Sequence, residues 1–150
     1  MQSINRRAMA FFMGLAISIM APCHSYAAQV FITEQETKLP PAKDEKLDSR
    51  GITRGPRVAL VDGSAARSPF HLQFKFQSFG GAKIDVESLR VILLKTPNVD
   101  LTPRVRPFAQ ADGIDIPEAE SPAGEYSVRV ELKDTEGRAV AKTFELKVAD

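Results

Sequence analysis

The chain has 150 residues, of which 43% are hydrophobic and 26% charged, enough for one small domain and its leader. Twenty Lys and Arg residues stand against 19 Asp and Glu, which gives a formal net charge of +1. A near-neutral mixture of charges lacks the basic stripe that nucleic-acid binding needs, and it gives no strong attraction to an anionic membrane. Both functions are therefore disfavoured from the outset.

Residues 1–27 are predicted to be a secretory signal peptide. Arg6 and Arg7 form a positive start, Ala8 to Ala21 carry no charge, and Ser25-Tyr26-Ala27 fits the small-x-small cleavage rule. The alternative is an uncleaved anchor, but the uncharged stretch is shorter than the ~20 residues that span a bilayer. We therefore expect cleavage after Ala27, a periplasmic or secreted protein, and no stable membrane insertion.

Cys23, the single cysteine of the chain, lies within this leader. A lipoprotein signal has a small residue directly before its cysteine, whereas Pro22 stands here, so lipidation of Cys23 is not expected. The chain after Ala27 would contain no cysteine and hence no disulfide or thiolate. It would hold 18 basic and 19 acidic residues, because positions 1–27 contain two arginines and no acidic residue.

Residues 28–56 are predicted to be a flexible linker. Gln29 to Thr33 is a short β-prone patch that could pair as an edge strand, but the rest is rich in charge, proline and glycine. With few large apolar residues, such a segment cannot offset its ordering entropy by burial. The alternative is a tether or a segment that folds on a partner.

Residues 57–150 show the period-two alternation of β-strands. The clearest strand follows Ser68-Pro69, with Phe70, Leu72, Phe74 and Phe76 on one face and His71 on the other. Strands are expected at 57–61, 70–77, 89–94, 104–109, 113–116, 124–133 and 138–148. One helical turn is expected at 84–88, a crossing segment at 100–103 and a polar loop at 118–123. About seven short strands without a long helix predict an all-β, antiparallel β-sandwich.

The order of motifs in this domain resembles a bacterial immunoglobulin-like domain. The residues that carry the resemblance are Asp85, Ser88, Leu89, Val91, Asp100, Leu101, Thr102, Ala123, Gly124, Tyr126, Val128, Val130, Asp134, Gly137, Phe144 and Val148. It implies an immunoglobulin-like sandwich in which the Tyr126 ring is buried and its hydroxyl meets a backbone acceptor. Domains of this kind serve adhesion, spacing, carbohydrate binding and protein contacts, so the resemblance implies no single activity.

The last hairpin is also similar to that of periplasmic copper-resistance sandwich proteins, which carry a histidine in its turn and another at the mature N-terminus. Here the turn reads Glu136-Gly137-Arg138, and Ala28 or Gln29 stands at the N-terminus. Arginine is not a plausible copper ligand. Calcium would need several carboxylates close together, and the turn aspartates are spread along the chain: Asp62, Asp85, Asp100, Asp112 and Asp134. No metal or cofactor is therefore assigned.

No catalytic residue is assigned either. His71, the one histidine after the signal, is expected to face solvent away from any nucleophile. Glu118 and Glu120 lie in a polar loop without an apolar pocket to raise a carboxyl pKa.

The sequence thus predicts an exported, non-enzymatic domain that acts as a protein-interaction or envelope accessory module with an unidentified protein partner. The contact is expected at edge strands or at the loops Ala82–Glu87, Thr96–Pro103 and Glu118–Ala123. The alternative is a periplasmic carrier of copper, calcium or another ligand. A carbohydrate-binding module would present exposed aromatics for sugar stacking, yet the chain has no tryptophan.

Overall fold

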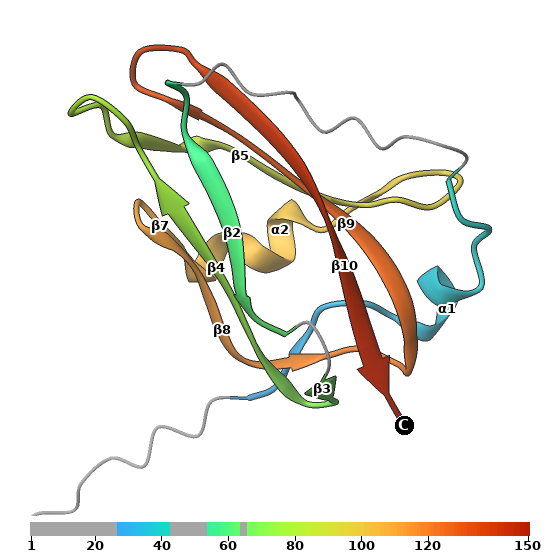
Figure 1. Ribbon diagram of the computed structural model, residues 1–150. Helices are drawn as coiled ribbons and strands as arrows, with labels where there is room; N and C mark the ends of the chain where they lie inside the picture. The colour runs from blue at the N-terminus through green and yellow to red at the C-terminus, as the bar shows by residue number, and fades with distance from the viewer. Residues whose placement is uncertain (1–26, 43–53, 64–65) are drawn as a thin grey trace, which may run out of the picture.

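Two β-sheets pack face to face in the computed structural model, which describes residues 27–42, 54–63 and 66–150 (Figure 1). One sheet has the order β1 (Gln29–Val30), β8 (Gly113–Glu120), β4 (Phe70–Gln77) and β2 (Arg57–Asp62), with β7 (Ala109–Gln110) also on β8. The other has the order β3 (Ala66–Arg67), β10 (Ala139–Ala149), β9 (Gly124–Asp134), β5 (Ile84–Leu93) and β6 (Val99–Asp100). The predicted all-β immunoglobulin-like sandwich is confirmed.

The pairing is antiparallel, with two exceptions at the ends of the sheets. The short strands β1 and β3 run parallel to β8 and β10, respectively. Two one-turn helices, α1 (Glu34–Thr37) and α2 (Thr102–Val105), and a 3-10 turn, η1 (Arg106–Phe108), complete the described elements.

The core lies between the two sheets and is built by the expected alternation. On β4 the four apolar side chains from Phe70 to Phe76 are buried, and His71 faces outward. The ring of Phe74 meets that of Phe144 from β10 edge to face, with centroids 5.2 Å apart. The apolar row on β4 is therefore the main contribution of the first sheet to the core, as its period predicts.

The C-terminal hairpin of β9 and β10 also has its predicted form. Gly137 closes the turn with a φ of 79°, a backbone region open to glycine at little cost. Tyr126 is buried, and its hydroxyl donates to the carbonyl of Pro122 at 2.7 Å. The role that the resemblance implies for this tyrosine is confirmed.

The segment predicted as a flexible linker is, over residues 27–42, an integral part of the fold, which we call the N-terminal arm. Its strand β1 pairs with the end of β8, and directly after it Phe31 and Ile32 are fully buried in the core. Charge and proline content pointed to a linker, but two adjacent large apolar side chains next to a free strand edge are enough to bind the arm. Residues 43–53, and the predicted signal peptide apart from Ala27, lie outside the described residues.

The helical turn predicted at 84–88 is wrong, because β5 begins at Ile84. The β5–β9 ladder shifts between Asp85 and Arg90, and the hydroxyl of Ser88 fills the gap by accepting from the Lys133 N–H at 2.8 Å. A β-bulge thus stands where a helical turn was expected. The carboxylate of Asp85 still accepts from the backbone N–H of Glu87, at 3.1 Å, as a capping residue would.

The strand predicted at 104–109 is also wrong. Helix α2 and the turn η1 occupy residues 102–108, and each has a proline in its first turn, a position that favours helix. Val105 is buried and anchors α2 to the core. The loop predicted at 118–123 is shorter than expected, since β8 continues to Glu120.

Candidate functional site

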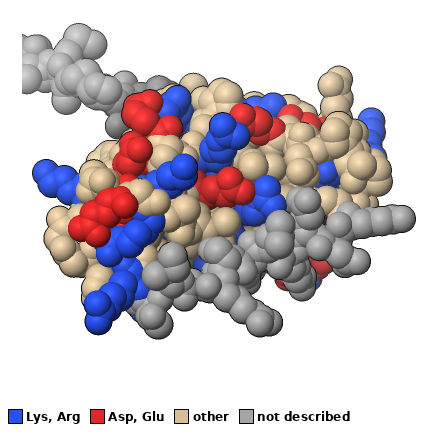
Figure 2. Space-filling view, turned by 90° about the horizontal axis from the view of Figure 1, so that it is seen from above, with Lys and Arg blue, Asp and Glu red and all other residues tan. Residues whose placement is uncertain are grey.

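Two loops meet at one end of the sandwich, at the top of Figure 1: one joins two strands of the second sheet, and the other connects the first sheet to the second. We call them together the hairpin end: the β9–β10 turn, residues 134–138, and the β4–β5 loop, residues 78–83. Thr135 donates its N–H to the carbonyl of Lys83 at 2.8 Å, and its hydroxyl accepts from the Lys83 N–H at 3.2 Å. Seen from above, basic and acidic side chains alternate over the surface without a large patch of one sign (Figure 2).

A buried ion pair fixes the turn. Arg138 donates through Nε to Oδ2 of Asp134 at 2.6 Å, while Oδ1 accepts from the backbone N–H groups of Glu136 and Arg138 at 3.0 and 2.9 Å. The side chain of Asp134 has 0% exposure. Burial by itself would raise the pKa of Asp134, but the hydrogen bonds from Arg138 and the two backbone donors outweigh it and lower the pKa. The carboxylate therefore remains ionised and holds the turn.

The same arginine holds the neighbouring loop in place. Arg138 donates from Nη2 to the carbonyl of Phe79 at 2.9 Å. Gly80 and Gly81 follow with φ of 68° and 82°, a left-handed turn that side chains disfavour. Phe79 is 49% exposed as a residue, and with Val30 and Val61 it makes up the exposed large hydrophobic residues of the described chain. A bulky aromatic is thus presented to solvent from a backbone fixed by an ion pair.

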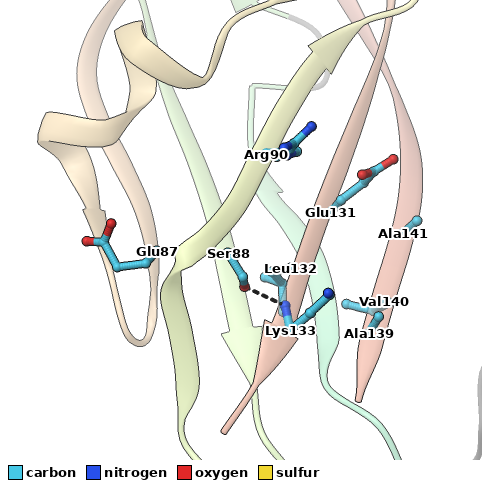
Figure 3. A pocket seen from close by; sticks show the side chains of 9 residues that line it. All are labelled: Glu87, Ser88, Arg90, Glu131, Leu132, Lys133, Ala139, Val140 and Ala141. Carbon is cyan, nitrogen blue, oxygen red and sulfur yellow. Dashed lines mark hydrogen bonds between the residues drawn. The ribbon is translucent and has the colours of Figure 1, made fainter. Parts of the chain in front are cut away.

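An open trough, of about 560 Å³, lies on the outer side of the second sheet, next to the β9–β10 turn (Figure 3). Its residues come from β5, β9 and β10: Glu87, Ser88, Arg90, Glu131, Leu132, Lys133, Ala139, Val140 and Ala141. Both glutamates have arginine partners, Arg106 for Glu87 at 2.6 Å and Arg129 for Glu131 at 2.8 Å. Within the described chain, Arg90 and Lys133 have no ion-pair partner within 4 Å.

His71 is exposed as predicted, but the structure adds two carboxylates that the pattern did not show. Its Nε2 lies 2.7 Å from Asp115 and its Nδ1 lies 3.2 Å from Asp62, on the strands to either side. The hydrogen bond with Asp115 is the largest influence on the pKa of His71; it outweighs burial and, with Asp62, raises the pKa above 6.5. Both ring nitrogens are occupied by carboxylates, so neither is available to activate a hydroxyl.

The other residues weighed from the sequence have local roles. Asp62 and Asp100 accept from backbone N–H groups one and two residues further on, at 2.8 and 2.9 Å. Glu118 and Glu120 are exposed on β8. Among residues 27–42, 54–63 and 66–150, no group of three or more His, Cys, Asp or Glu side chains is placed to hold a metal ion. In the same residues, no helix has the length and apolar character of a membrane span.

Of the three expected contact loops, one contributes to the hairpin end through Ala82 and Lys83. The second expected loop, residues 96–103, contains β6 and the start of α2. In the third, residues 118–123, the carbonyl of Glu120 accepts hydrogen bonds from the N–H groups of Phe31 and Ile32. The contributions of Phe79 and Arg138 were missed. The signal available was the pair Gly80-Gly81 after an aromatic residue, which the sequence marks as a turn without showing the direction of the side chain.

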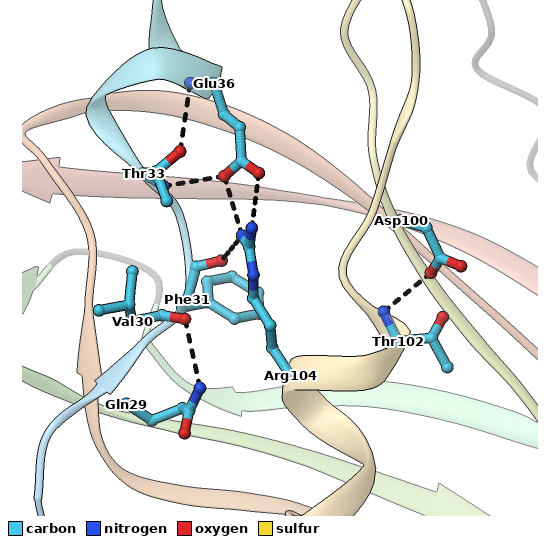
Figure 4. Close-up of polar contacts among 8 residues, drawn as sticks. All are labelled: Gln29, Val30, Phe31, Thr33, Glu36, Asp100, Thr102 and Arg104. Atoms are coloured by element: carbon cyan, nitrogen blue, oxygen red, sulfur yellow. Dashed lines mark hydrogen bonds and ion pairs between the residues drawn. The ribbon is translucent and has the colours of Figure 1, made fainter.

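A second arginine holds the N-terminal arm (Figure 4). Arg104 of α2 donates to both carboxylate oxygens of Glu36, at 2.8 and 2.7 Å, and to the carbonyl of Phe31 at 3.0 Å. Thr33 and Glu36 form a capping box around the start of α1. The Arg104 hydrogen bond is the main reason that the pKa of Glu36 falls to about 2, against burial that would raise it; donors from Thr33 add to the effect.

The geometry defines the class of the molecule as an immunoglobulin-like two-sheet sandwich with an ordered N-terminal arm. No family model and no curated protein matches the chain. Among solved structures it is similar to CopC from Methylosinus trichosporium OB3b, with 16% identity over 61% of this chain and 93% of that chain, and a TM-score of 0.40.

Proposed function

We propose that this protein is an exported, non-enzymatic interaction module of the bacterial envelope, and that it contacts a protein partner through the hairpin end. The observation that carries the proposal is the exposure of Phe79 on a loop whose backbone is fixed by Arg138. The predicted signal peptide supports export to the periplasm or beyond.

An aromatic side chain held rigidly at the surface is suited to binding. Large aromatic residues are enriched among the few that carry most of the energy of protein interfaces. Because the loop is already ordered by the Asp134–Arg138 pair, little conformational entropy is lost when a partner covers it. The turn position at which copper-resistance sandwiches carry a histidine is occupied here by Arg138, which the fold uses to hold Phe79.

The test compares capture of partners from a periplasmic extract by the mature chain and by two variants. Phe79→Ala removes the exposed ring, and Val61→Ala is the matched control, since Val61 is 52% exposed on edge strand β2. We expect the first variant to retain about tenfold less of a specific partner, a loss of about 1.4 kcal/mol, and the second to retain it fully. Equal capture by both variants would contradict the proposal.

The alternative, a carrier of copper or calcium, is tested on the same preparation. A carrier would bind metal in a stoichiometric ratio and melt at a higher temperature in its presence, because a ligand of the folded state stabilises it. A rise of this kind that is unaffected by Phe79→Ala would favour the carrier.

A further inference from the structure

The trough next to the hairpin end has a pattern of charge and side-chain size that points to its occupant. Its glutamates are neutralised by arginine partners, whereas Arg90 and Lys133 have none within 4 Å in the described chain. Asp85 lies opposite Lys133 in the ladder, and Arg90 is near enough to Asp100 to help the Thr102 hydrogen bonds lower the pKa of that carboxyl, but neither carboxylate forms an ion pair with these cations within 4 Å. Arg90 and Lys133 are thus the cations of the trough without a contact ion pair in the described chain, and an anionic ligand would supply one.

The spacing of the two cations favours an extended chain over a small ion. Arg90 lies opposite Glu131 in the β5–β9 ladder, and Lys133 follows two residues later on the same face. In a regular ladder such diagonal neighbours are about 7–8 Å apart, and the long side chains of Arg90 and Lys133 can adjust to the bulge at 85–90. Two acidic residues separated by one residue in an extended peptide are about 6.6–6.8 Å apart and lie on one face, so each can reach one cation.

The side of the trough toward β10 is lined by small side chains. Ala139 lies opposite Lys133 and Ala141 opposite Glu131, both with side chains of a single carbon. Figure 3 shows these small side chains beside the charged side chains of Glu131 and Lys133. Small side chains allow a peptide backbone to approach the sheet closely.

We propose that the trough binds an extended acidic segment of the partner protein, with a Glu-x-Glu or Asp-x-Asp pair on Arg90 and Lys133. The proposal rests on the proposed function: Phe79 supplies the apolar anchor, and the trough selects partners by charge. Charges at such positions mainly govern the rate and specificity of association, so the contact is sensitive to salt.

The test uses a blocked synthetic peptide, Gly-Glu-Ala-Glu-Ala-Gly, added to the ¹⁵N-labelled mature chain and followed by NMR. We expect shifts of the amides around Arg90 and Lys133, about tenfold weaker binding of the peptide with both glutamates replaced by glutamine, and no comparable shifts with inorganic phosphate. Equal binding of the glutamine peptide would overturn the proposal. Phosphate that shifts the same amides and displaces the peptide would reduce the trough to a small-anion site and would overturn it as well.

Variants separate this proposal from the one on which it rests. The double variant Arg90→Glu, Lys133→Glu should lose the peptide shifts, whereas Lys75→Glu, an exposed lysine on the other sheet, should keep them. Phe79→Ala should keep the peptide shifts and lose partner capture. Retention of the peptide by the double variant would contradict the trough assignment, whatever the result at Phe79.

Discussion

The N-terminal arm and the hairpin end are held by the same arrangement of hydrogen bonds, but one buries a phenylalanine and the other exposes one. In each, an arginine donates to the carbonyl of a phenylalanine and to a carboxylate: Arg104 with Phe31 and Glu36, Arg138 with Phe79 and Asp134. Phe31 has 0% exposure, whereas Phe79 has 49%. The hydrogen bonds fix the backbone in both places, and the neighbouring structure decides whether the ring is buried.

The two phenylalanines differ in role: Phe31 contributes to the stability of the fold, and Phe79 is available for contact with a partner. Phe31 follows a strand that pairs with β8, so its ring enters the space between the sheets. Phe79 precedes two glycines with positive φ, and its ring is left outside. Arg104 therefore holds a phenylalanine that is part of the core, and Arg138 holds one that is exposed to solvent.

The largest expected effect is on the buried ring. Phe31→Ala should lower the free energy of unfolding by about 3–5 kcal/mol, the usual range for removing a core phenylalanine. Phe79→Ala should change it by less than about 0.5 kcal/mol, as for a surface position. Urea denaturation of the two variants measures both values. Similar losses in the two would remove the distinction between the regions.

Breaking the ion pair of the arm should have the next largest effect. Glu36→Gln should cost about 2 kcal/mol, less than the 3–5 kcal/mol of a fully buried pair, because Arg104 is partly exposed. The folded pKa of Glu36 is about 2, below its value of 4.5 when unperturbed, so its contribution is full above pH 4.5 and is lost as the pH falls toward 2. Unfolding free energies of both proteins between pH 7 and pH 2 test this; the difference between them should shrink as acid is added.

Loss of the Asp134 carboxylate should affect mainly the hairpin end. Asp134→Asn removes the charge that holds Arg138 and should lower the free energy of unfolding, because the guanidinium is left without its carboxylate partner. It should also speed hydrogen exchange of the amides at 79–83, with little change in the arm. Uniformly faster hydrogen exchange throughout the sandwich would show that the Asp134–Arg138 pair does not act locally.

The smallest effect is expected at His71. Its folded pKa is raised above 6.5, so its contribution is full below pH 6.5 and is lost as the pH rises through the folded pKa. The pair is exposed, which limits the contribution to less than about 1 kcal/mol. After signal cleavage the chain would have one histidine, so a single imidazole NMR signal reports the titration. Asp115→Asn should move that pKa downward; an unchanged value would contradict the geometry.

Sequence patterns were reliable where a strand has one buried face. The rows on β4 and on the C-terminal hairpin were predicted because alternation alone sets which side faces the core. The burial of Tyr126 followed from the family resemblance and the strand period.

The failures came where tertiary contacts outweigh local composition. The arm looks like a linker by charge, yet Phe31 and Ile32 find a strand edge that is distant in sequence. Residues 84–88 have a capping aspartate, but pairing of Ile84 with Asp134 draws them into β5. The pairing of Arg138 with Phe79 joins residues 59 positions apart, so no local pattern could reveal it.

Photo-crosslinking in cells tests most directly whether Phe79 is the point of contact with the partner. Benzoylphenylalanine placed at position 79 keeps an aromatic ring there, and the same residue at position 61 is a control of similar exposure. A contact at Phe79 predicts a discrete protein adduct from position 79 and none from position 61. Adducts of equal yield at both positions, or an adduct at position 61 alone, would contradict it.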